Sequence, residues 1–81
     1  MVTRREDRRP EAERFGQALR RVREEHGLSQ DRLAEEAGLS QHYLSEVERG
    51  VNSPTLTVIM KLCEALDVPP SELLDEVWRG R

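Results

Sequence analysis

Residues 29–49, SQDRLAEEAGLSQHYLSEVER, predict two short helices joined by a tight turn. Ser29 and Ser40 suit the position that opens a helix, because a serine hydroxyl accepts a hydrogen bond from a backbone N–H one turn further along. Gly38 lies between the two expected helices, where a left-handed residue without a Cβ ends the first helix and turns the chain. The stretch therefore favours a compact helical pair over an extended segment.

The side chains of this stretch divide into an inward and an outward face. Small or apolar residues recur at helical spacing, and these are Leu33, Ala34, Ala37, Leu39, Leu44 and Val47. The outward face of the second helix carries hydrogen-bonding side chains, namely Gln41, His42, Ser45, Glu46 and Arg49. This layout is typical of a helix-turn-helix motif, whose second helix enters the major groove of DNA.

The rest of the chain predicts three further helices. Apolar residues recur at helical spacing between Glu11 and His26, and Gly27 would end that helix. A core-packing helix over 55–66 is indicated by Leu56, Ile59, Met60, Cys63 and Leu66. Ser71 can cap a short fifth helix that ends near Trp78, since residues 67–70 break the chain before it. We therefore expect an all-α fold of five helices.

Length and composition limit the chain to one small domain. Eighty-one residues suffice for a single core and leave no room for an effector-binding module. We expect a flexible basic arm over residues 1–10, the helix-turn-helix domain over 11–78 and a tail over 79–81. The four arginines of the arm could reach a phosphate or a minor groove, but Glu6 and Asp7 interrupt their charge, so a solvated tail is favoured.

The location of the protein follows from what its sequence contains. Residues 1–10 lack the apolar segment of a secretory signal, and no stretch is long and apolar enough to span a membrane. The single cysteine, Cys63, fits a reducing cytoplasm and an apolar helical stripe better than a reactive or metal-binding role. We therefore expect a cytoplasmic protein.

Charge is the main objection to a DNA-binding function, because the net charge is −3. It is unevenly distributed: residues 1–26 carry eight arginines and six acids, whereas residues 27–81 carry five bases and ten acids. From Glu64 to Glu76, both included, there are five acids and no base. Screening limits each exposed charge to about 8 Å at physiological salt, so an acidic C-terminal end is compatible with DNA binding elsewhere.

A pattern of residues extends over roughly 14–77. It comprises Gln30, Leu33, Ala34, Gly38, Leu39, Leu44, Val47, Glu48, Gly50, Pro54, ALDV at 65–68 and the pair Leu73-Leu74. This pattern resembles the Cro/cI-type (XRE) helix-turn-helix family. The resemblance implies a five-helix, lambda-repressor-like DNA-binding domain, in which the second and third helices form the motif.

The resemblance also implies roles for three polar residues. In this family an arginine near the end of the first helix pairs with a glutamate at the end of the recognition helix, and Arg23 and Glu48 occupy the matching positions. We expect a partly buried structural pair, which is costly to break by removing one partner. Gln30 matches the family position that binds a phosphate at the start of the second helix.

Side-chain chemistry suggests what the outward face could bind. Gln41 can bind adenine through N6 and N7, His42 can donate to a guanine or a phosphate, and Glu46 can accept from cytosine N4. For His42 and Glu46 a solvated, non-contacting role stays open. Arg49 and Asn52, beyond the helix, suit the DNA backbone. The expected DNA-binding residues are Gln30, Ser40, Gln41, His42, Tyr43, Ser45, Glu46, Arg49 and Asn52.

The last expected helix carries more apolar residues than so small a domain can bury. These are Leu73, Leu74, Val77 and Trp78. Tryptophan is enriched at interfaces, and a two-fold dimer presents the same helix to its copy. We therefore expect a homodimer through this helix, although Trp78 folding back onto its own core is the alternative. Two recognition helices about 34 Å apart would impose a palindromic site.

The sequence indicates a regulator and not an enzyme. It has no metal-ligand spacing, phosphate loop or nucleophilic triad, so we expect no cofactor and no metal. The main hypothesis is a dimeric transcriptional regulator that binds double-stranded DNA at a palindromic operator. Within this class, a controller of a restriction–modification system and an antitoxin are alternatives. A protein-interaction module that uses the acidic C-terminal helices is the alternative from another class.

Overall fold

The fold is that of a computed structural model, which describes residues 10–80. Five helices account for most of these residues: α1 (Pro10–Glu25), α2 (Gln30–Ala37), α3 (Gln41–Glu48), α4 (Leu56–Leu66) and α5 (Ser71–Arg79). The expected all-α, five-helix class is confirmed. The arm expected over residues 1–10 lies outside the described residues except for Pro10, as does Arg81 of the expected tail.

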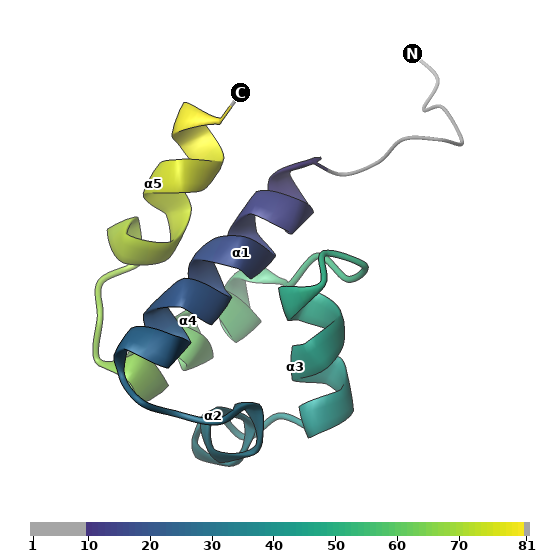
Figure 1. The fold of residues 1–81 in the computed structure, drawn as a ribbon, viewed down its shortest axis with the longest axis vertical. Helices are drawn as coiled ribbons and strands as arrows, with labels where there is room; N and C mark the ends of the chain where they lie inside the picture. Colours follow the sequence, from purple (N-terminus) through teal and green to yellow (C-terminus); the bar gives the residue numbers. More distant parts are fainter. Residues whose placement is uncertain (1–9, 81) are drawn as a thin grey trace.

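Helix α1 is the central element of the fold. It crosses the middle of the molecule in Figure 1, with α5 along one side, α3 on the other and α4 behind it. Helix α1 packs mainly against α5 and α3, whereas α2 packs against α3 and α4. Helix α3 is thus supported by both α1 and α2.

One core joins all five helices. Its fully buried side chains are Leu19, Val22, Leu33, Leu44, Val47, Leu62, Leu66 and Leu73. Complete burial of one such side chain contributes about 1.5–3 kcal/mol relative to leaving it in water. The expected inward face of α2 and α3 is buried, with Leu39 half-buried against the core in the turn.

Local hydrogen bonds explain why the helical pair begins and ends where it does. Ser29 accepts from the N–H of Arg32 at 3.0 Å, and Ser40 accepts from the N–H of Tyr43 at 3.0 Å. Gly38 adopts the left-handed conformation with a φ of 72°. The following N–H, from Leu39, then bonds to the carbonyl of Ala34 at 2.8 Å. Both predicted caps and the predicted turn are confirmed.

The inward face predicted for α4 is partly wrong. Leu56 is 71% exposed and Met60 is 41% exposed, whereas Leu62 is completely buried beside Cys63 and Leu66. Apolar residues surround much of this helix, so periodicity alone could not select the buried face. The packing of α4 against α2 selects the face that carries Leu62, and it leaves Leu56 and Met60 in solvent.

The start predicted for α5 is also wrong, since Ser71 is not its cap. Pro70 occupies the cap position without a side-chain hydrogen bond, and its φ of −55° is already close to a helical value. The N–H of Glu72 bonds to the carbonyl of Pro69 and that of Leu73 to the carbonyl of Pro70, both at 3.0 Å. Proline is pre-set for a helix start, so the helix needs no serine cap. Pro10 opens α1 for the same reason.

Candidate nucleic-acid interface

The polar face of α3 lies at the surface of the molecule. Gln41 and His42, in the first turn, and Arg49, directly after the helix, are exposed, as is the cap residue Ser40. The other candidates on this helix are half-buried: Tyr43, Ser45 and Glu46. Tyr43 also packs against the core, so only part of its ring can contact a ligand.

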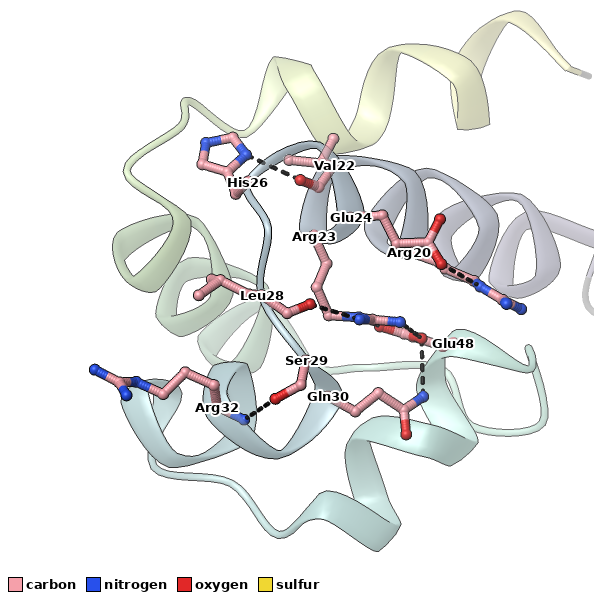
Figure 2. A network of polar contacts seen from close by, with 10 residues as sticks. All are labelled: Arg20, Val22, Arg23, Glu24, His26, Leu28, Ser29, Gln30, Arg32 and Glu48. Atoms are coloured by element: carbon pink, nitrogen blue, oxygen red, sulfur yellow. Dashed lines mark hydrogen bonds and ion pairs between the residues drawn. The ribbon is translucent and has the colours of Figure 1, made fainter.

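A buried ion pair holds the end of α3 against α1. Figure 2 shows Arg23 reaching from α1 to Glu48, with Leu28 and Gln30 beside the pair. Nε of Arg23 lies 2.6 Å from Oε2 of Glu48, and Nη2 lies 3.1 Å from Oε1. Nη1 of Arg23 also donates to the carbonyl of Leu28 at 2.7 Å. The guanidinium therefore ties α1, the α1–α2 loop and α3 together.

The Arg23–Glu48 pair is buried in the protein. The side chains of Arg23 and Glu48 are only 10% and 3% exposed. The hydrogen bonds that Arg23 donates to Glu48 raise the pKa of Arg23 above its ordinary value, although burial acts in the opposite direction. No buried polar side-chain atom within residues 10–80 lacks a hydrogen-bond partner. The desolvation cost of the pair is thus offset by a complete set of hydrogen bonds.

Gln30 belongs to the same network. Its side-chain amide donates to Oε1 of Glu48 at 2.9 Å, so this N–H group faces the protein interior (Figure 2). The residue opens α2 and is half-buried. The amide N–H expected to meet a phosphate is therefore already bound to Glu48. The sequence did not predict this contact.

Glu46 is the centre of a second polar chain on the outer side of α3. Its Oε1 accepts from Nδ2 of Asn52 at 2.6 Å, and its Oε2 lies 3.1 Å from Nε2 of His42. His42 and Glu46 are four residues apart on one helix, a spacing that brings side chains together. The contact with Asn52 depends on the path of the loop after α3, so helical spacing alone could not predict it.

The apolar end of α5 has a more limited surface than expected. Leu73, one of the residues expected at a dimer contact, is completely buried within its own chain, so its side chain offers no surface to a partner. Leu74 and Val77 are half-buried, and Trp78 is 65% exposed. These three residues line a shallow groove together with Glu11 and Arg14 of α1. The two α1 residues were missed because they are at least 60 positions away in sequence.

No group of three or more histidine, cysteine, aspartate or glutamate side chains within residues 10–80 is placed to bind a metal ion. No helix there is long and apolar enough to cross a membrane. Cys63 is buried, and its burial raises the pKa of the thiol.

Together, the capped turn, the exposed polar face of α3 and the five-helix scaffold define a helix-turn-helix DNA-binding transcriptional regulator. Residues 19–73 match the helix-turn-helix family HTH_3, and the chain belongs to this family. The match covers α2, α3 and α4 completely. It confirms the resemblance to the Cro/cI-type family.

Within this family, the chain is similar to several individual regulators. The chain is 42% identical over 62 residues to the control protein C.BamHI of Bacillus amyloliquefaciens, covering 75% of this chain and 76% of the relative. It is similar to the crystal structure of the restriction–modification controller protein C.AhdI from Aeromonas hydrophila, with 45% identity, a TM-score of 0.77 and coverage of 79% and 97%. The clp gene regulator ClgR from C. glutamicum gives 33% identity, a TM-score of 0.81 and coverage of 86% and 91%.

Proposed function

We propose that this regulator binds a palindromic operator as a homodimer, with α3 of each copy in the major groove of double-stranded DNA. The observation that carries the proposal is the exposed first turn of α3, with Gln41 and His42 outward, on a helix fastened to α1 by Arg23 and Glu48. A rigidly positioned helix suits base recognition, because contacts to base edges depend on precise hydrogen-bond geometry.

Within this interface, Gln41 is the main candidate for a base contact. Its exposed amide can both donate to and accept from adenine, and it lies at the start of the helix. Gln30, Ser40 and Arg49 are proposed to contact phosphates, which set the position of the protein on DNA and carry no sequence information. Tyr43 and Ser45 can add contacts from the exposed parts of their side chains.

Homodimerisation is supported by the apolar groove at α5. Trp78 is exposed, and Leu74 and Val77 are half-buried beside it. In a two-fold dimer each copy would present the same groove to its partner, so one apolar surface is used twice. The acidic side chains that follow Glu64 would then lie at the dimer end of the molecule, away from α3.

Restriction–modification control is our preferred biological role. It is favoured over the antitoxin alternative because C.AhdI is named as a restriction–modification controller protein and C.BamHI as a control protein. Adjacent genes for a restriction enzyme and a methyltransferase would support this assignment, whereas an adjacent toxin gene would contradict it. The proposed role requires access to DNA in the cytoplasm and requires no catalytic activity or cofactor.

Fluorescence anisotropy with labelled DNA from upstream of its own gene tests the proposed function. We expect a saturable complex at about 150 mM salt, where the specific affinity of such regulators is typically about 10⁻⁸–10⁻¹¹ M. The affinity for an unrelated duplex should be lower by a factor of at least about 10³. Equal affinity for both duplexes would contradict the proposal and would favour a protein-interaction role for the acidic helices.

Gln41→Ala provides the matched variant for this test. Loss of one good bidentate contact should lower selective affinity by about 1–3 kcal/mol in each half-site while leaving unrelated DNA unaffected. Lys61→Ala is the control, because Lys61 is exposed on α4 and not on α3. An unchanged affinity of Gln41→Ala for the selected site would remove Gln41 from the interface.

A further inference from the structure

We propose that Glu46 contacts no base of its own, and that Asn52 and Glu46 are positioning residues that orient His42 toward one base pair. His42 is then a specificity-determining residue, and the three side chains act as one unit. This inference rests on the proposed placement of α3 in the major groove. It differs from the expectation that Glu46 accepts directly from a cytosine.

The first step is the attachment of Glu46 to the loop after α3. Nδ2 of Asn52 donates to Oε1 of Glu46 at 2.6 Å. The carbonyl of Glu46 also accepts from the backbone N–H of Val51 at 3.0 Å and from that of Asn52 at 3.3 Å. Asn52 is therefore joined to Glu46 through both its side chain and its main chain. This arrangement restricts the rotation of the carboxylate.

The second step is the contact between the carboxylate and the imidazole. Nε2 of His42 lies 3.1 Å from Oε2 of Glu46, so each carboxylate oxygen already has a partner within the protein. A cytosine amino group would have to share these oxygens with the partners that already contact them. The side chain of Glu46 is 28% exposed and that of His42 is 80% exposed. His42 is thus the outer member of the chain and the better placed to meet a base.

The electrostatics near DNA also favour His42 as the residue that meets a base and Glu46 as its support. A carboxylate near DNA is repelled by the phosphates, but Glu46 accepts a hydrogen bond from Asn52 and lies beside Nε2 of His42, so both its oxygens face polar partners in the protein. A carboxylate beside one ring nitrogen favours a proton on that nitrogen. With Nε2 directed at Glu46, Nδ1 is the ring nitrogen left for the edge of a base. Fixing the ring in this way restricts which base edge it can match.

Selection of bound sites from random DNA tests the inference, with the wild-type protein compared with His42→Ala, Glu46→Ala and Asn52→Ala. We expect all three variants to lose discrimination at the same base pair of each half-site, by about 5- to 150-fold for His42→Ala. The double variant His42→Ala/Glu46→Ala should lose no more than His42→Ala alone. Such non-additivity is expected when two residues act through one contact.

Gln41→Ala is the matched control, because Gln41 is exposed in the same turn and outside the chain of three residues. It should relax a different base pair. Circular dichroism of each variant should match the wild type, since all the changes lie on the outer side of α3 or in the loop that follows it.

Two results would overturn the inference while leaving the proposed function intact. Glu46→Ala could relax a base pair different from that of His42→Ala, which would mean that Glu46 contacts its own base. Asn52→Ala could weaken all sites equally and leave their ranking unchanged, which would assign it to a phosphate. If the wild-type protein selects no motif, the proposed function itself fails and the inference fails with it.

Discussion

Glu48 is the residue on which the position of the recognition helix depends most. Its carboxylate accepts three hydrogen bonds, two from Arg23 and one from Gln30. The acceptor lies at the end of α3, whereas its donors lie in α1 and at the start of α2. One carboxylate therefore fixes three helices, and its removal leaves a buried guanidinium with one remaining contact, to Leu28.

Glu48→Ala should therefore destabilise the fold strongly. Removing one partner of a buried pair costs about 3–5 kcal/mol, and we expect a loss in this range from urea unfolding. Arg20→Ala is the control, because Arg20 pairs with Glu24 at an exposed i, i+4 position and should cost about 0–1 kcal/mol. A loss below about 1 kcal/mol for Glu48→Ala would show that the pair is not important for stability.

Cys63 should react with thiol reagents only when the protein unfolds. The residue is 3% exposed, and burial raises the pKa of its thiol, so the reactive thiolate is disfavoured in the folded state. The rate of reaction with a chromogenic disulfide at pH 8 should rise with urea in parallel with the unfolding transition. Rapid reaction without denaturant would contradict the burial of this side chain.

At the scale of elements, the close crossing of α1 and α3 depends on Gly16, which has no side chain. A Cβ at Gly16 would lie 2.4 Å from the carbonyl oxygen of Glu48 and 2.5 Å from that of Val47. Backbone atoms of the last turn of α3 thus occupy the space where any other residue would place its side chain. The contact at Gly16 and the Arg23–Glu48 pair together fix the orientation of α3 relative to α1.

Gly16→Ala should displace α3 despite the higher helix propensity of alanine. Overpacking costs about 1–3 kcal/mol, and a clash with backbone atoms belongs at the upper end of this range, above the gain of about 1 kcal/mol from replacing a helical glycine. We expect a lower melting temperature and weaker selective DNA binding at temperatures where the variant remains folded. Gln17→Ala, at the exposed neighbouring position, should change neither quantity. A stabilised Gly16→Ala protein would contradict the close crossing.

At the scale of the whole molecule, the candidate DNA-binding surface at α3 and the candidate dimerisation surface at α5 share α1 as their support. Helix α1 packs against α3 and against α5, so it connects the two surfaces (Figure 1). The ion pair between Arg21 and Glu76, at 2.8 Å, adds an exposed link between α1 and α5. A change at α5 is therefore expected to affect DNA binding mainly through the oligomeric state.

Trp78→Ala should weaken the dimer and, through it, the affinity for the operator. Interface tryptophans often contribute at least about 2 kcal/mol, so the dimer dissociation constant should rise about 30-fold or more in sedimentation analysis. Val51→Ala is the matched control, since Val51 is also exposed at 64% but lies outside the α5 groove. An unchanged dimer in Trp78→Ala, or a wild-type monomer, would contradict dimerisation through this groove.

Local interactions explain why much of the architecture could be predicted. The caps at Ser29 and Ser40 and the left-handed Gly38 involve residues a few positions apart, so their types in sequence are sufficient to indicate two helices and a turn. The same is true of the apolar periodicity of α1 and α2. The prediction for the start of α5 was wrong because Pro70, whose φ is already helical, occupies the cap position that was expected for Ser71.

Tertiary packing determined the features that depend on segments distant in sequence. The face of α4 that is buried, the close approach at Gly16 and the burial of Leu73 all follow from which helices meet, and residue spacing within one helix does not specify this. The contact of Asn52 with Glu46 likewise follows from the path of a loop. Hydrophobic burial is non-directional, so a sequence can indicate that a helix has an apolar side, whereas only its neighbours in three dimensions determine which side chains are covered.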